Sequence, residues 1–191
     1  MRKPIRAVAA ATLAIAVVSC SSNSEEIAQE PSELEATDTK VLAVAKLASS
    51  DGEPRGQVTM QNDGGSLSLD LDLSGLEPGE KAFHLHAIGD CTSADFKSAG
   101  GHLNPFGNTH GSQSENGQHL GDFPNISVDP NGSAKAVFPI EGDTDRNIQA
   151  IMDDDGTAVM VHAGPDDYKS DPAGAAGSRI ACGVLAPMDA L

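Results

Sequence analysis

Two histidines separated by a single residue are the first sign of chemistry in this chain. His84 and His86 lie in the segment Phe83-His84-Leu85-His86, whose apolar residues are typical of a strand. Because strand side chains alternate between two faces, both imidazoles are expected to point to the same side. Neutral imidazole is the commonest protein ligand for a transition metal. Such a pair is also found on solvated strand faces, so the rest of the chain must decide between the two interpretations.

The other four of the six histidines favour a metal site. His102, His110 and His119 fall in residues 90–131, a stretch with little apolar periodicity, and Asp122 follows His119 after three residues. A loop of this length inside a domain is normally functional, or fixed by a cross-link or an ion. His162 follows an apolar strand segment. Six unrelated polar residues would be expected to spread along the chain, whereas clustering with a carboxylate predicts a metal site.

The elements that must position these residues are predicted to be short strands. Strict alternation in Ser66–Leu73 places four leucines on one face, and Asp63-Gly64-Gly65 before it indicates a tight hairpin. About eight strand-like segments and no helix are expected, which gives an all-β antiparallel sandwich or barrel with two long loops, 90–131 and 164–178. The segments are 41–48, 56–62, 66–73, 81–89, 133–140, the short apolar piece 148–152, 157–163 and 179–186.

Composition excludes some functions. The formal net charge is −16 at pH 7, so the chain has no basic surface with which to bind nucleic acid. A chain this acidic should also repel anions, unless a local positive group reverses the field.

The first residues are predicted to direct export. Basic residues precede an apolar run, 7–18, that is too short to span a bilayer, and the run ends in Val17-Val18-Ser19-Cys20. This resembles a bacterial lipobox, in which the cysteine carries the lipid; the alternative is an ordinary signal peptide cut nearby. We expect a signal peptide at 1–19, an acidic disordered tether at 20–39 and a domain at 40–191. The expected location is the periplasm or cell envelope, with membrane contact only through lipidated Cys20.

The two remaining cysteines agree with export. Cys91 and Cys182 form an even pair in an oxidising compartment, which predicts one disulfide. Two buried free thiols are the alternative.

Seven blocks of the sequence resemble the signature segments of the copper/zinc superoxide dismutase family. They occur in the family's order across residues 40–187, and His102, His110, His119 and Asp122 follow one another at the family's intervals of eight, nine and three residues. The blocks are Phe83-His84-Leu85-His86, Gly89-Asp90-Cys91-Thr92-Ser93, Gly101-His102-Leu103-Asn104-Pro105, His110-Gly111, His119-Leu120-Gly121-Asp122, Val161-His162-Ala163-Gly164 and Gly177-Ser178-Arg179-Ile180-Ala181-Cys182-Gly183-Val184.

The resemblance implies an eight-stranded Greek-key barrel with one copper and one zinc ion per subunit. Copper would be bound by His84, His86, His102 and His162, and zinc by His102, His110, His119 and Asp122, so that His102 bridges the two ions. Arg179 would lie beside the copper and attract the superoxide anion, although a surface arginine in an ion pair is an alternative. Asp166 would link one copper and one zinc histidine, unless Asp166 and Asp167 are plain loop charges.

The implied reaction is the dismutation of superoxide to oxygen and hydrogen peroxide. The loop 164–178 contains one basic residue, Lys169, so attraction of the substrate is expected to depend on Arg179 alone, or else on Lys97 or Lys169. A non-catalytic copper/zinc module is the main alternative. A zinc hydrolase is disfavoured because three histidines and an aspartate leave zinc no open position. Besides the substrate, the expected partner is a second copy of the chain in a homodimer.

Overall fold

The computed structural model describes residues 39–188, which belong to a compact unit that spans Ala36–Leu191. The predicted signal peptide, Cys20 and all of the tether except its last residue lie outside the described residues, so these remain predictions. No helix in the described part of the chain is both long and apolar enough to cross a membrane.

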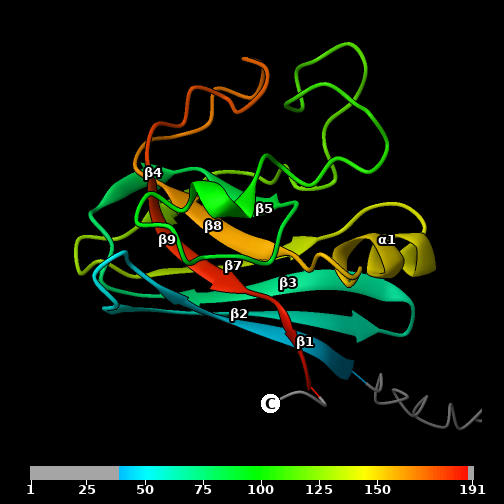
Figure 1. Cartoon of the computed structure of the whole chain (residues 1–191), viewed down its shortest axis with the longest axis horizontal. Helices are drawn as coiled ribbons and strands as arrows, with labels where there is room; N and C mark the ends of the chain where they lie inside the picture. The colour runs from blue at the N-terminus through cyan, green and yellow to red at the C-terminus, as the bar shows by residue number, and fades with distance from the viewer. Residues whose placement is uncertain (1–38, 189–191) are drawn as a thin grey trace, which may run out of the picture. The chain divides into compact units, whose positions relative to one another are not determined.

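Antiparallel strands dominate the domain, as the sequence predicted. The main sheet has eight strands in the order β5-β8-β9-β1-β2-β3-β7, with β10 paired to β1 (Figure 1). It curls into a half-barrel around the core. The strands are β1 (Thr39–Ala48), β2 (Pro54–Asp63), β3 (Ser66–Leu73), β5 (Phe83–His86), β7 (Ala134–Pro139), β8 (Ala158–His162), β9 (Arg179–Val184) and β10 (Ala186–Pro187).

The hairpin between β2 and β3 confirms the predicted turn and the predicted core face. Asp63 pairs with Ser66, and the Gly65 N–H donates to Asn62 Oδ1 at 2.8 Å. The inward leucines of β3 (Leu67, Leu69, Leu71 and Leu73) are at most 2% exposed. Each buried leucine contributes roughly 1.5–3 kcal/mol of transfer free energy, which fixes the register of β3, because a slip of one residue would expose the whole apolar face.

The expectation of no helix was wrong. Helix α1 spans Thr144–Ile151, and Asp143 caps its start by accepting a hydrogen bond from the Arg146 N–H at 3.0 Å. Ile148, Ile151 and Met152 pack on the core from one side of this helix. Their spacing of three and four residues is helical, and the segment 148–152 taken alone was too short to show it.

The stretch 90–131 is also less irregular than expected. It contains the one-turn 3-10 helix η1 (Lys97–Ala99) and strand β6 (Ile126–Val128). β6 pairs with β4 (Gly79–Lys81) in a separate two-stranded sheet. In Figure 1 the middle of this stretch, in green at the upper right, and the loop that follows β8, in orange, both rise from the same side of the main sheet.

A second, smaller core lies outside the main one. It consists of Phe96, Ala99, Ala158, Met160 and Cys182, with Cys91 packed against it. Cys91 and Cys182 form a disulfide, with their Cα atoms 5.8 Å apart, as the sequence predicted. This cross-link attaches the long loop to β9.

Candidate metal centre

Strand β5 provides two ligands from one face and two core residues from the other. All four residues are buried: Phe83 and Leu85 belong to the main core, and the alternation of the strand places His84 and His86 on the opposite face. β5 pairs with β8, at whose end His162 lies.

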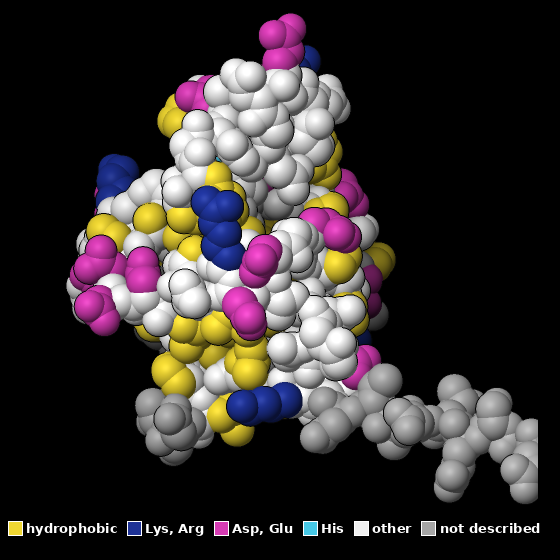
Figure 2. Space-filling model, turned by 90° about the vertical axis from the view of Figure 1, so that its right-hand side faces the viewer, with side chains coloured by type: hydrophobic (Ala, Val, Ile, Leu, Met, Phe, Trp, Pro, Cys, Tyr) yellow, Lys and Arg dark blue, Asp and Glu magenta, His cyan; other side chains and the backbone are white. Residues whose placement is uncertain are grey.

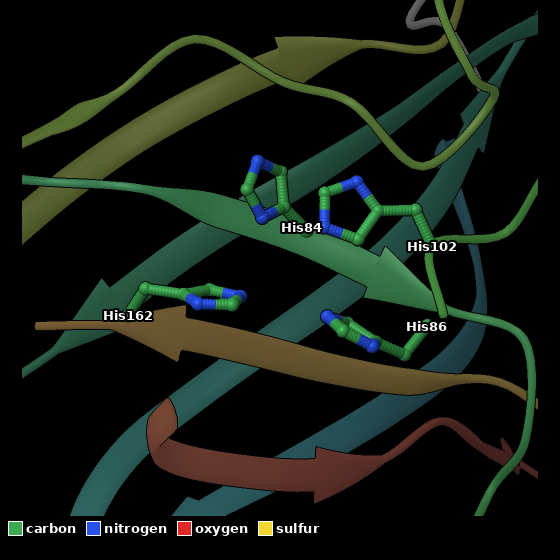
Figure 3. Close-up of side chains that lie close together, drawn as sticks. All are labelled: His84, His86, His102 and His162. Carbon is green, nitrogen blue, oxygen red and sulfur yellow. The ribbon is translucent and has the colours of Figure 1, made fainter. Parts of the chain in front are cut away.

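Four histidines form the first ligand group. His84, His86, His102 and His162 each offer one nitrogen, and these four atoms all lie within 4.8 Å of one another. Their rings turn toward a common centre from β5, from β8 and from the long loop (Figure 3). The ring centroids of His84 and His102 are 4.0 Å apart, and those of His86 and His162 are 5.7 Å apart.

Three histidines and an aspartate form the second group, and its members are His102, His110, His119 and Asp122. Carboxylate oxygens of Asp122 lie 2.7 Å from His102 Nδ1, 3.2 Å from His110 Nδ1 and 3.3 Å from His119 Nδ1. Ligand atoms of a tetrahedral zinc ion with bonds near 2.0–2.1 Å would be about 3.3 Å apart. The group therefore has the ligand types and the spacing of a closed tetrahedral zinc site.

Unpaired nitrogens inside the protein independently show that the two groups fit metal ions. Buried polar atoms normally have hydrogen-bond partners, because an unsatisfied one costs free energy. Among the described residues, each of the six histidines nevertheless has one buried ring nitrogen without a partner. These are Nδ1 of His84, His110 and His119, and Nε2 of His86, His102 and His162. Coordinated metal ions would satisfy all of them.

His102 belongs to both groups. Its Nδ1 contacts Asp122 of the second group, and its unpaired Nε2 is left to the first. One imidazole ring can therefore contact both ions, as the resemblance implied.

Besides His102, four histidines use the ring nitrogen opposite the unpaired one for a hydrogen bond. His86 Nδ1–H donates to the Gly100 carbonyl at 3.0 Å, and His162 Nδ1–H donates to the Gly177 carbonyl at 3.2 Å. Asp166 accepts from His84 Nε2–H at 2.7 Å and from His110 Nε2–H at 3.0 Å. These bonds fix the tautomer of each ring and aim the unpaired nitrogen at the metal position. Asp166 thus joins a histidine of each group, the position that the resemblance implied for it.

Asp166 is itself held in place by Asn125 and Tyr168, two residues for which the sequence predicted no role. The Asp166 N–H donates to Asn125 Oδ1 at 2.8 Å, and Asn125 Nδ2 donates to the Asp166 carbonyl at 3.0 Å. The Tyr168 N–H donates to Asp166 Oδ1 at 2.6 Å, while the Tyr168 hydroxyl accepts from the Asn125 N–H. Asn125 is 41 residues from Asp166, so the order of residues along the chain contains no signal for this contact.

Burial and hydrogen bonding give the metal-free site the protonation states that metal binding needs. Burial, with the nearby His102, lowers the pKa of His86 to about 2, and burial, with the nearby His84, lowers that of His162 to about 3. Burial also lowers the pKa of His102 to about 4, although the hydrogen bond to Asp122 opposes the shift. Burial raises the pKa of Asp122, but hydrogen bonds from His102 and the Gly111 N–H outweigh it and lower the value to about 2. At neutral pH these imidazoles are neutral and the carboxylate is charged, which are the forms that ligate metals.

Arg179 lies beside the first group. It lines a pocket of about 380 Å³ together with His86, His102 and His162. Its Nη1 and Nη2 donate to the carbonyls of Phe96 and Gly100, each at 2.6 Å. Partial burial lowers the pKa of Arg179, yet an arginine remains charged at neutral pH. The pocket therefore combines three imidazoles of the first group with a fixed positive charge, which suits redox chemistry on a small anion.

Comparison with known proteins gives a consistent result. The family model described as copper/zinc superoxide dismutase (SODC) matches residues 54–185. The chain is 42% identical over 146 residues to superoxide dismutase [Cu-Zn] 2 of Aquifex aeolicus, an alignment that covers 75% of this chain and 85% of that protein. It is 40% identical over 149 residues to superoxide dismutase [Cu-Zn] of Caulobacter vibrioides, with 75% and 84% covered.

A solved structure has the same fold. The crystal structure of a SOD-like protein from Bacillus subtilis superposes with a TM-score of 0.69 at 31% identity, over 75% of this chain and 97% of that one. The overall fold is thus shared with an experimentally determined relative.

Proposed function

The chain belongs to the copper/zinc superoxide dismutase family, and we propose that it is an exported oxidoreductase that protects the cell envelope from superoxide. Two superoxide anions and two protons would give one molecule of oxygen and one of hydrogen peroxide. The observation that carries this proposal is that both ligand groups are complete and share His102, while Arg179 lines the pocket of the first.

The two groups differ in the ion that they suit. Four imidazoles fit copper, which must be stable in two oxidation states, and three histidines with an aspartate fit a closed zinc site. Copper bound by His84, His86, His102 and His162 would supply the one-electron chemistry of the reaction. Zinc bound by the second group would stabilise the arrangement of the long loop around Asp122.

The chain's own residues bind the anion and move a proton. Arg179 attracts superoxide into the pocket and orients it by charge-assisted hydrogen bonds. Of the described residues that line this pocket, Arg179 alone has a fixed positive charge. When it is not held by copper, His102 Nε2 can take up a proton and deliver it to the product, because this atom faces the first group and has no hydrogen-bond partner among the described residues.

The surroundings of the pocket explain why a local charge is needed. The whole chain has a formal charge of −16. Figure 2 shows acidic side chains spread over the face in view, where the lysines and arginines do not gather into a patch. An anionic substrate therefore depends on the field of the pocket rather than on that of the whole protein.

Location at the envelope is proposed from the N-terminal sequence. Lipid attached at Cys20 would anchor the domain, and residues 21–38 would separate it from the membrane. Metabolic labelling with a fatty-acid probe tests this: label on the native chain and none on Cys20→Ala supports the proposal, whereas equal label on both contradicts it.

The activity is tested by loading the purified chain with copper and zinc. Superoxide generated by xanthine oxidase reduces cytochrome c, and the loaded chain should suppress this reduction while the metal-free chain should not. Full occupancy of both ions without suppression would contradict the enzyme and favour a non-catalytic copper/zinc module.

A further inference from the structure

Residues 96–100 contact Arg179 through their main chain. They enclose η1 and lie between the disulfide and His102. The Phe96 and Gly100 carbonyls accept one hydrogen bond each from the two terminal guanidinium nitrogens. These contacts span 83 and 79 residues of sequence. The direction in which Arg179 presents its charge therefore depends on where these two carbonyls lie.

Phe96 has a strained backbone and a buried ring. Its φ is +56°, in the left-handed region, which costs a residue other than glycine roughly 1–2 kcal/mol. Its side chain is 4% exposed and is the aromatic member of the second core, beside Ala99, Met160 and Cys182. Burying a phenylalanine contributes roughly 1.5–3 kcal/mol, enough to stabilise this conformation. A strained residue fixed by its surroundings next to a functional group suggests a functional role.

We infer that Phe96 is a positioning residue, whose buried ring fixes the carbonyl that orients the Arg179 guanidinium toward the pocket. The inference rests on the proposed function in one respect, namely that Arg179 acts on an anion. Without the ring, the Phe96 backbone would relax toward negative φ. Its carbonyl would then turn away, and Arg179 would lose one of its two fixed acceptors.

Phe96 is a more selective site for a test substitution than Gly100. The Gly100 carbonyl accepts from His86 Nδ1–H as well as from Arg179, so moving it would also disturb a metal ligand. The Phe96 carbonyl accepts from the Ala99 N–H within its own turn and from Arg179. The charges on either side of Phe96 offset each other, because Lys97 forms an ion pair with Asp95 at 2.7 Å. Substitution of Phe96 should therefore act on the arginine without changing the ligands.

Azide titration of the copper- and zinc-loaded full chain tests this role without turnover. Azide is a small anion that ligates Cu(II), and its binding is followed in the visible and electron paramagnetic resonance spectra. We expect Phe96→Ala to weaken azide binding about tenfold, the scale of one charge-assisted hydrogen bond. Phe96→Leu, which keeps an apolar anchor, should restore most of the affinity. Phe96→Val replaces the alanine variant if that chain does not fold.

A double-mutant cycle with Arg179→Ala separates positioning from general loosening. If Phe96 acts through the guanidinium, Phe96→Ala should have no further effect on azide affinity in the Arg179→Ala background. The matched control is Phe138→Ala on β7, which removes the ring that stacks on Phe123 and should lower stability without changing azide affinity.

Two results would overturn the inference: native azide affinity in the metal-loaded Phe96→Ala chain, or an equal loss in both backgrounds. A native chain that fails to suppress cytochrome c reduction, but shows the expected azide pattern, would contradict the proposed function and leave the role of Phe96 intact.

Discussion

His102 is the residue on which both ligand groups depend. It is 8% exposed, and its two nitrogens serve different groups. The other five histidines contribute one nitrogen each, and four of these use the opposite nitrogen for a hydrogen bond to Asp166 or to a carbonyl. Five of the six rings, all except that of His119, therefore have both nitrogens assigned to a contact or a ligand group. Changes at the residue scale should thus affect metal binding and substrate attraction separately.

Substitution of Arg179 should separate substrate attraction from metal binding most clearly. Arg179→Ala should slow superoxide removal about tenfold or more at low ionic strength, because the pocket loses its fixed positive charge. Both metals should stay bound, since Arg179 is not a ligand. The rate measured by pulse radiolysis should also become less dependent on salt. The control is Arg146→Ala, which removes the same charge from α1 outside the pocket; loss of copper from the Arg179 variant would contradict this role.

Asp166 should act on the metals instead. In Asp166→Asn one oxygen that accepts from His84 or His110 is replaced by an amide that donates, so one histidine loses its orientation. Zinc affinity, measured by competition with a chromogenic chelator, should fall about 10- to 100-fold. The same substitution at exposed Asp70, on β3, is the matched control. Equal zinc affinities in the two variants would show that Asp166 does not orient the ligands.

At the scale of elements, the loop that follows β8 packs closely on the metal centre because it has a glycine, Gly174, where its backbone meets Asp166. Gly174 has φ +63°, and a Cβ there would overlap Asp166 Oδ1 and lie 2.6 Å from His110 Nε2. The loop backbone therefore packs directly against the carboxylate that joins the two ligand groups.

Gly174→Ala should consequently displace Asp166 and weaken zinc binding together with stability. We expect its free energy of unfolding to drop by roughly 1–3 kcal/mol more than that of Gly52→Ala, because the side chain must be forced into a packed site. Gly52 is the matched control, since it also has positive φ, +85°, but no atom within 4 Å of its Cβ position. Denaturant titration of both variants measures the difference. Similar losses in the two would mean that the loop shifts freely.

The strands could be predicted from sequence more fully than the contacts between loops. The range predicted for β3 agrees residue for residue, because its alternation is a local pattern. The ligand blocks were visible because their spacing is fixed along the chain. Asn125, Tyr168, Gly174 and Phe96 were missed, since each acts on a residue far away in sequence or through its backbone. Helix α1 was not predicted, because its signal appears only when the capping residue Asp143 is read together with the apolar residues 148–152 that follow it.

At the scale of the whole molecule, buried histidines connect folding to metal binding. Without metals, the folded domain must keep several buried imidazoles neutral. In the unfolded chain the same imidazoles become protonated near pH 6.5. The folded pKa values of His86, His162 and His102 are about 2, 3 and 4. Because these values are lowered, the folded state binds fewer protons than the unfolded state, and stability falls as the pH drops below 6.5.

The metal-free chain should therefore lose stability between pH 7.5 and pH 5, and each such histidine contributes up to about 1.4 kcal/mol per pH unit below 6.5. Guanidinium titrations after chelator treatment measure this dependence. The chain loaded with copper and zinc should resist to lower pH, because protons must displace the ions before they reach the ring nitrogens. A metal-free stability that is unchanged over this range would mean that the histidines become protonated without unfolding, and hence that the ligand groups open without their metals.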